Sequence, residues 1–539
     1  MKSISTQTKA LIEQLNPPVS FWERITGRRD DADLLLQIGL AGEPAAVVDI
    51  IPFVLSESRE VARAAAATVD KLLGTLLQHE LAQLDSIFRE RSPYLGRYRM
   101  EWHKLKPADL SRLESYGSYS VALLGLASFH ASGYVREEAV KRLSRMSGGG
   151  ELPFLLIRLN DWVQHVRKAA LAAVTSRLSP SYAGSFAANL PLITRLEQTE
   201  RGDHQQIIEA IEGLLKSPEC GDALLSALDS PDRLVRRISF RLAVDTTSVD
   251  QSSIMEHALN DEDTVIRLWS ARKIASEFAG EALDKFLALM RRDRFMPVRR
   301  EALRAIVNRL SERAPHELRL ALLDSHASMR EEARYLLLKI ENIDVASFYR
   351  QALESAEGVG LYAAISGLGE TGSASDDSLL IEYTLHKSAK VRRAAIKALS
   401  RLNGGEHLSV FMAALQDEMP SVSREARKAL SGRLNVIGGE PLWGIFNSTT
   451  RHFVRQNVLY LLSRLGKWDS IYFLIKAAGD SDDTIAERSR LYIWRWLGRF
   501  NRSFTAPTHQ QLNRLEGALK ESGNLLDENV REQLLFSIK

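Results

Sequence analysis

The apolar residues of this chain recur with the spacing of amphipathic helices, and short polar turns separate one helical stretch from the next. Residues 221–228 (GDALLSAL) predict a first helix, and residues 298–310 (VRREALRAIVNRL) show the pattern of a second helix, which opens after a polar turn. One such pair cannot bury its apolar face alone. The pattern therefore predicts an all-α fold in which successive helix pairs stack on one another.

A motif within these pairs sets the period of the repeat. An Asp in the turn is followed by Arg six positions later and by Ala three positions after that, as at Asp161 and Arg167 or at Asp324 and Arg330. We take the Arg position as the anchor of each repeat, which places anchors at 136, 167, 236, 267, 299, 330, 361, 392, 423, 455 and 486. The steps are 31 or 32 residues, except for a step of 69 that predicts one stretched repeat with its anchor near Ile207.

The anchor arginines are expected to be structural. The turn Asp can cap the second helix and accept a hydrogen bond from the anchor arginine, as Asp261 and Arg267 would do. Three anchors are not arginine, namely Leu361, Ser423 and Ala486, but each keeps a small residue three positions later. The register of the repeat therefore continues through them.

The pattern L-x-D-x5-R-x2-A at a 31-residue step resembles the HEAT family, in particular the short HEAT-like repeats of phycobilisome lyases. The resemblance covers about residues 121–500, and weakly 31–78. It implies a right-handed α-α superhelix, a HEAT-like solenoid, whose second helices line the concave side. The expected organisation is an N-terminal segment (1–30), HEAT-like helices (31–78), a basic and aromatic insertion (79–120), the repeat array (121–503) and C-terminal capping helices (504–539).

Composition narrows the classes of function. The 71 Lys and Arg residues nearly balance the 68 Asp and Glu residues, so any argument for an acidic partner depends on where the charges lie. The sequence contains no nucleotide-binding loop, no HExxH motif and no G-x-S-x-G elbow, and Cys220 is its single cysteine. Residues 1–15 lack the apolar core that is typical of a signal peptide, and the sequence has no apolar run of 18 residues. We expect a cytoplasmic, non-enzymatic protein with no catalytic residue, metal or cofactor and no association with a membrane.

The register allows equivalent positions of successive repeats to be compared. Positions one, five and nine past the anchor differ by four residues, so they share one face of the second helix. This face is rich in bases, and we take the following as candidate partner-binding residues: Lys141, Arg241, Arg272, Arg304, Lys397 and Lys428 at five past, and Lys168, Arg237, Arg300, Arg393 and Arg424 at one past. Glu137, Glu331 and Glu487 interrupt the second group. A solvated face with no partner is the competing interpretation.

Two segments depart from the repeat. The insertion carries Arg97, Tyr98, Arg99 and Trp102, which either stack on bases and grip phosphates or anchor the insertion on the helices beneath it. The region after Gly439 holds four of the eight tryptophans, which form either a terminal cap of the array or a surface for a partner.

These observations favour a scaffold that binds an acidic protein partner along a basic groove. A second hypothesis is a nucleic-acid binder that contacts the phosphate backbone without sequence preference. The resemblance to bilin lyases adds a chromophore-handling protein as a third hypothesis, the least favoured because the sequence shows no clustered ligand-like set of residues.

Overall fold

The computed structural model describes residues 4–15, 31–90, 101–246, 250–355, 357–522 and 525–538. Within these ranges the chain forms α-helices and short 3-10 helices and no strand, which confirms the predicted all-α repeat fold. The chain divides into two compact units, Met1–Phe286 and Leu287–Lys539.

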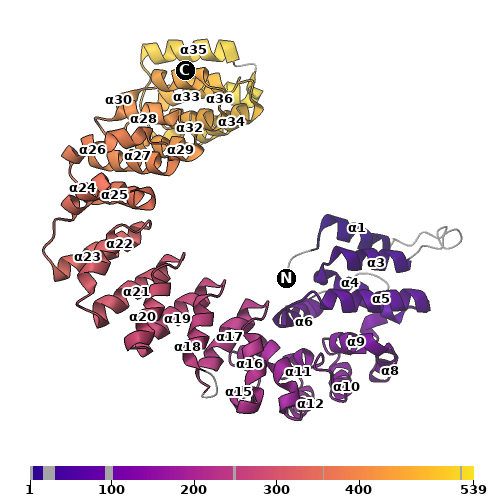
Figure 1. Cartoon of the computed structure of the whole chain (residues 1–539). Helices are drawn as coiled ribbons and strands as arrows, with labels where there is room; N and C mark the ends of the chain where they lie inside the picture. Colours follow the sequence, from indigo (N-terminus) through magenta and orange to yellow (C-terminus); the bar gives the residue numbers. More distant parts are fainter. Residues whose placement is uncertain are drawn as a thin grey trace. The chain divides into compact units, whose positions relative to one another are not determined.

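Unit 1 begins with helices of unequal length and continues as successive helix pairs (Figure 1). Its helices up to the repeat array are α1 (Thr6–Leu15), α3 (Asp31–Ala41), α4 (Val47–Ile50), α5 (Arg59–Leu73), α6 (Leu81–Glu90), α8 (Leu110–Glu114) and α9 (Ser120–Ala127). The array continues with α10 (Gly133–Leu143), α11 (Leu152–Arg158), α12 (Gln164–Thr175), α13 (Ala183–Ala188), α14 (Leu190–Leu196), α15 (Gln205–Lys216), α16 (Gly221–Ala227), α17 (Arg233–Val244), α18 (Gln251–Leu259), α19 (Thr264–Glu277) and α20 (Gly280–Met290). The boundary between the two units falls within α20.

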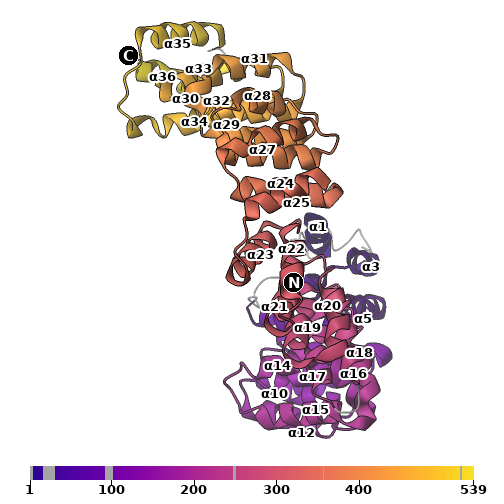
Figure 2. The same cartoon turned by 60° about the vertical axis from the view of Figure 1, so that its left-hand side comes forward.

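Unit 2 repeats the same arrangement, and Figure 2 shows its helices from α24 to α35 stacked layer upon layer. Its helices are α21 (Met296–Arg309), α22 (Ala314–Leu322), α23 (Ala327–Ile340), α24 (Val345–Ser355), α25 (Gly358–Thr371), α26 (Ser378–Ile381), α27 (Ala389–Asn403), α28 (Leu408–Leu415), α29 (Pro420–Ser431), α30 (Leu434–Ile437), α31 (Glu440–Ser448), α32 (His452–Leu462), α33 (Lys467–Ala477), α34 (Asp483–Leu497), α35 (His509–Ser522) and α36 (Glu528–Ile538). One continuous cluster of buried apolar residues runs from Leu303 to Leu534.

The register predicted from the sequence matches the helix boundaries. Apart from the stretched repeat, the anchor is the fourth residue of each second helix from α10 onwards, as Arg236 is in α17 and Ser423 is in α29. The stretched repeat between anchors 167 and 236 has its first helix divided into α13 and α14, and its second helix is α15, which contains Ile207. At the other end of the array, Thr508 and Gln511 exchange backbone-to-side-chain hydrogen bonds as a capping box before α35.

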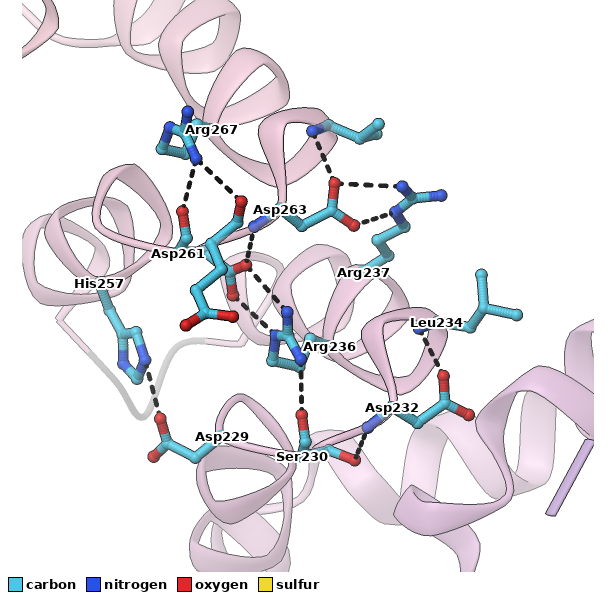
Figure 3. Close-up of polar contacts among 12 residues, drawn as sticks. Asp229, Ser230, Asp232, Leu234, Arg236, Arg237, His257, Asp261, Asp263 and Arg267 are labelled. Carbon is cyan, nitrogen blue, oxygen red and sulfur yellow. Dashed lines mark hydrogen bonds and ion pairs between the residues drawn. The ribbon is translucent and has the colours of Figure 1, made fainter. Parts of the chain in front are cut away.

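Arg236 shows how an anchor arginine links two successive turns (Figure 3). Arg236 donates from Nη1 to the backbone carbonyl of Ser230 at 2.8 Å, in the turn that precedes its own helix. Its Nε and Nη2 donate to the carboxylate of Asp261 at 2.8 and 3.1 Å, in the turn of the next repeat. Asp261 also accepts the backbone N–H of Asp263 at 2.6 Å, so this carboxylate shapes the turn in which it lies.

This arrangement corrects the predicted pairing. We expected the anchor arginine to bond the turn carboxylate of its own repeat, but in its own turn it reaches a backbone carbonyl, and its carboxylate partner lies 25 residues further on. Six residues back and 25 residues forward add up to the 31-residue step. The pair recurs at Arg136 and Asp161, Arg236 and Asp261, Arg299 and Asp324, Arg392 and Asp417, and Arg455 and Asp480.

After anchor Arg330 the next turn lacks an aspartate, and another carboxylate replaces it. Residue 355 is a serine, and Arg330 instead pairs with Glu370 of α25, which also accepts a hydrogen bond from Arg334 at 2.7 Å. Burial alone would raise the pKa of Glu370, but the hydrogen bonds from Arg330 and Arg334 hold it below its usual value. The ion pair therefore persists with a different acceptor.

Glycine permits close packing between helices in unit 2, and Gly367 of α25 provides a test. A Cβ at this position would lie 2.2 Å from the ring of Tyr349, which is fully buried and donates its hydroxyl to the Leu322 carbonyl at 3.0 Å. We expect Gly367→Ala to lower the free energy of unfolding by about 1–3 kcal/mol through overpacking. Gly444→Ala is the matched control, because no atom lies within 4 Å of the place that its Cβ would take, and it should raise stability by up to about 1 kcal/mol. Urea unfolding followed by circular dichroism measures both; equal effects would contradict the packing argument.

Candidate partner-binding surface on the second helices

The predicted face is the solvent side of the second helices. In α27 the side chains of Arg392 and Ile396 are buried, whereas Arg393 is half-buried and Lys397 and Arg401 are exposed. The same division holds along the array, because positions one, five and nine past the anchor lie opposite the apolar stripe that packs on neighbouring helices. Within unit 2, α25, α27, α29 and α32 pack side by side in that order, so their outer faces form one continuous surface.

Several of the predicted bases are neutralised by nearby carboxylates. At five past the anchor, Lys141 pairs with Glu137 at 2.7 Å, Arg304 pairs with Glu332 at 2.7 Å, and Lys428 pairs with Glu425 at 3.2 Å. At one past the anchor, Arg237 pairs with Asp263, which is the N-cap residue of α19 and accepts the N–H of Val265 (Figure 3). A comparison of one repeat position at a time misses these acids, because they lie at other positions of the same repeat or in the next repeat.

Other predicted bases form no ion pair with any residue that the structure describes. They are Lys168, Arg241, Arg393, Lys397 and Arg424. Arg237 and Arg393 both lie one past an anchor, but only Arg237 has an acidic partner in the part of the chain that the structure describes. The cause is the N-cap residue of the next second helix, which is Asp263 in α19 and Met419 in α29. Of the remaining candidates, Arg272 is exposed on α19, and Arg300 is half-buried on α21.

Three of these bases lie on two adjacent helices. Arg393 and Lys397 belong to α27, and Arg424 belongs to α29, which packs directly against α27. We call these three residues the α27–α29 basic face. Lys428 and Arg401 border it, the first paired with Glu425 and the second 3.8 Å from the carboxylate of Glu370. The face therefore has a net positive charge and is held on rigid helices.

Of the four candidate residues in the insertion, the structure describes Trp102, and its side chain is part of the core. Trp102 is 4% exposed, and its backbone carbonyl accepts a hydrogen bond from Nε2 of buried His130 at 3.0 Å. This supports the interpretation in which the insertion is anchored by its aromatic residue, because a buried ring cannot stack on a base. Arg97, Tyr98 and Arg99 lie outside the described residues.

Most of the late tryptophans are also structural. Trp468 is buried and donates from Nε1 to the carbonyl of Thr505 at 2.8 Å, and Trp496 donates to the carbonyl of Lys467 at 2.8 Å. Trp443 stacks on Phe446 with ring centroids 4.8 Å apart. Trp494 differs, since 48% of its surface is exposed.

Two searches of the described residues bear on other classes of site. In these ranges no three or more His, Cys, Asp and Glu side chains gather in a way that would hold a metal ion. None of the described helices combines the length and the apolar character needed to cross a bilayer. Cys220 lies buried at the end of a 3-10 turn, Pro218–Cys220.

Comparison with known proteins gives one match in sequence and several in structure. Residues 346–431 match the family model described as HEAT repeats, and no curated protein matches the chain. Similar solved structures include a Kap95:Nup1 complex, 13% identical over 98% of this chain and 74% of that chain, with a TM-score of 0.35. Another is importin beta in an ammonium sulfate condition, 12% identical over 98% of this chain and 80% of that chain, with a TM-score of 0.31.

The matched segment contains α25, α27 and α29, and with them the Arg392–Asp417 pair and the α27–α29 basic face. The same contacts between anchor and turn occur in the repeats before and after it. The chain therefore contains HEAT repeats at residues 346–431, and their arginine–aspartate contacts recur elsewhere along the array.

Proposed function

We propose that this protein is a non-enzymatic scaffold that binds an acidic segment of a partner protein along the solvent-exposed face of its second helices. The observation that carries the proposal is the α27–α29 basic face, where Arg393, Lys397 and Arg424 have no acidic partner among the described residues. Guanidinium groups bind carboxylates through paired hydrogen bonds, and a charge-complementary surface steers a partner to its binding position.

The distribution of charge favours a protein partner over a nucleic acid. The chain has a net charge of only +3, and the one-past positions of α23 and α34 carry the exposed carboxylates of Glu331 and Glu487. A phosphate backbone that followed the second helices would meet these carboxylates, whereas a protein segment can present bases or polar groups opposite them. The finer resemblance to phycobilisome-lyase repeats rests on the 31-residue step and stays a prediction, as does the chromophore-handling role that it implies.

A charge-reversal variant tests the proposal. The variant Arg393→Glu/Lys397→Glu/Arg424→Glu is compared with Arg292→Glu/Lys387→Glu/Lys520→Glu, which makes the same change in charge at exposed positions outside the second helices. The probes are a fluorescein-labelled 20-residue polyglutamate and 20-base-pair and single-stranded DNA of the same label, followed by fluorescence anisotropy at about 50 mM salt. We expect polyglutamate binding to weaken roughly tenfold or more in the first variant and to stay unchanged in the second.

Two results would contradict the proposal. If polyglutamate fails to bind the unmodified protein at low salt, the basic face is a solvated surface. If DNA binds more tightly than polyglutamate, with an affinity that falls steeply as salt rises and is lost in the first variant, the surface is a phosphate-backbone site.

A further inference from the structure

A cavity near the end of the array combines arginines with aromatic side chains. It has a volume of about 560 Å³ and lies where α32, α33 and α34 meet the segment that follows α34. We call it the C-terminal pocket, and its charged and aromatic lining consists of Arg464, Lys467, Arg495, Arg499 and Arg502 with Tyr460, Tyr492, Trp496 and Phe500. No Asp or Glu among the described residues lines it.

The absence of a lining carboxylate distinguishes this cavity from two other cavities in the described part of the chain. A cavity of about 300 Å³ in unit 1 contains Arg158 and Arg195 but also Asp85, which pairs with Arg158. A cavity of about 620 Å³ in unit 2 brings four arginines together with Asp293, Glu317 and Asp324. In those places the protein supplies its own counter-ions, whereas in the C-terminal pocket the positive charge is not balanced by a lining residue.

One of the five cations, Lys467, has a structural role. Lys467 donates to the carbonyls of Phe500 and Ser503 at 3.0 and 2.8 Å, and its ammonium lies 3.7 Å from the centroid of the Phe500 ring. Lys467 therefore binds the segment that follows α34 to the start of α33. Arg464, Arg499 and Arg502 are exposed, and their side chains form no hydrogen bond or ion pair with any described residue. Cations near a helix C-terminus are favoured by the helix dipole, but that effect does not require three unpaired arginines to line one cavity.

The aromatic side chains supply a second kind of surface. Tyr460, Tyr492, Trp496 and Phe500 are each half-buried, so each keeps part of its ring accessible. The indole N–H of Trp496 is bonded to the Lys467 carbonyl, and its ring contacts Phe500 with centroids 5.2 Å apart. These contacts fix the orientation of the rings. A ligand with a flat apolar ring can stack against such a wall, while planar guanidinium groups bind phosphate oxygens in pairs.

We propose that the C-terminal pocket binds a phosphate monoester that carries an aromatic ring. The phosphate would be bound by Arg464, Arg499 and Arg502, and the ring would pack on Tyr492, Trp496 or Phe500. A phosphotyrosine side chain and a purine mononucleotide both present this chemistry. The site is separate from the α27–α29 basic face, so either proposal can fail without the other.

Isothermal titration calorimetry of the full chain with phenyl phosphate, inorganic phosphate and phenol tests the shared chemistry. We expect phenyl phosphate to bind roughly tenfold or more tightly than either fragment, because it uses both walls of the pocket. Adenosine monophosphate and a short phosphotyrosine peptide then separate the two sources of the group. Arg464→Gln/Arg499→Gln should weaken phenyl phosphate binding at least roughly tenfold, since each lost charged hydrogen bond is worth about that factor.

The matched control is Arg488→Gln/Lys520→Gln, which removes two exposed charges from α34 and α35 without touching the pocket. It should bind phenyl phosphate like the unmodified protein, as should the α27–α29 charge-reversal variant. Circular dichroism confirms that the Gln variants keep their helical content. The proposal is overturned if phenyl phosphate does not bind at low salt, if inorganic phosphate binds equally well, or if the pocket variant and its control behave alike.

Discussion

Replacing Asp161 by Asn is expected to lower the free energy of unfolding of the segment around α10 to α12 by about 3–5 kcal/mol. Asp161 is fully buried, and its carboxylate accepts hydrogen bonds from Arg136 at 2.8 and 2.9 Å and from Arg158 at 2.9 Å. It also accepts the backbone N–H of Val163 at 2.9 Å. The variant leaves two buried guanidinium groups with one carboxylate fewer, and uncompensated buried charge is the most costly result of breaking such a pair.

The pKa of Asp161 also reflects its burial and its contacts with the two arginines. Burial alone would raise this pKa, but the hydrogen bond from Arg136 and the charge of Arg158 hold it below the usual value of an aspartate. The carboxylate therefore contributes stability above the pKa that it has in the unfolded chain, near 4, and this contribution is lost as pH falls through its lower folded-state value.

Hydrogen exchange measured by mass spectrometry over residues 120–178 localises the effect, and urea unfolding gives its size. Asp222→Asn is the control, because this exposed aspartate of α16 also begins with one negative charge. The control should change stability by less than about 0.5 kcal/mol. A comparable loss in both variants would mean that net charge, and not the buried contacts, determines the effect.

The sequence predicts the repeat well because its period and its packing have the same origin. Arg236 reaches a carbonyl six residues back and a carboxylate 25 residues forward, so its contacts span one 31-residue step. The choice of acceptor could not be predicted from spacing. Asp261 and Asp293 lie near Arg267 in sequence with the same motif, and only three-dimensional contacts tell which carboxylate an arginine uses. Arg330 shows this most clearly, because it pairs with a glutamate 40 residues away.

The candidate surface was predictable in outline and not in detail. Positions one and five past the anchor are four residues apart, which places Arg393 and Lys397 on the same face of α27. The structure has both on the solvent side of this helix. The position of a base in its repeat does not determine whether it has an acidic partner, however. Arg304 and Lys397 occupy the same place in their repeats, but Arg304 has Glu332 of the next second helix within 2.7 Å. The C-terminal pocket could not be predicted from the sequence, because its lining comes from three helices and the segment that follows them.

Acidification from pH 7 to pH 4 is expected to weaken the same part of unit 1 through His130. This residue occupies the turn position that Asp161 has in the next repeat: its Nδ1 accepts the N–H of Ser132 at 3.0 Å. The other ring nitrogen, Nε2, therefore carries the proton and donates to the Trp102 carbonyl at 3.0 Å. Burial lowers the pKa of His130 to about 4, and the nearby charges of His103 and Arg136 act in the same direction.

The sign and size of the effect follow from this pKa. An unfolded histidine takes up a proton near pH 6.5, whereas folded His130 stays neutral until about pH 4. Its contribution to stability is complete above pH 6.5 and is lost as pH falls toward 4, with a total of about 3 kcal/mol. His130→Asn should flatten this dependence, since an amide oxygen can accept the N–H of Ser132 and cannot be protonated in this range. Urea unfolding at pH 7.5, 6.5, 5.5 and 4.5 measures the slope, with His316→Asn, an exposed histidine of α22, as the control. If both variants keep the slope of the unmodified protein, the pH dependence arises elsewhere and His130 is not the group that titrates.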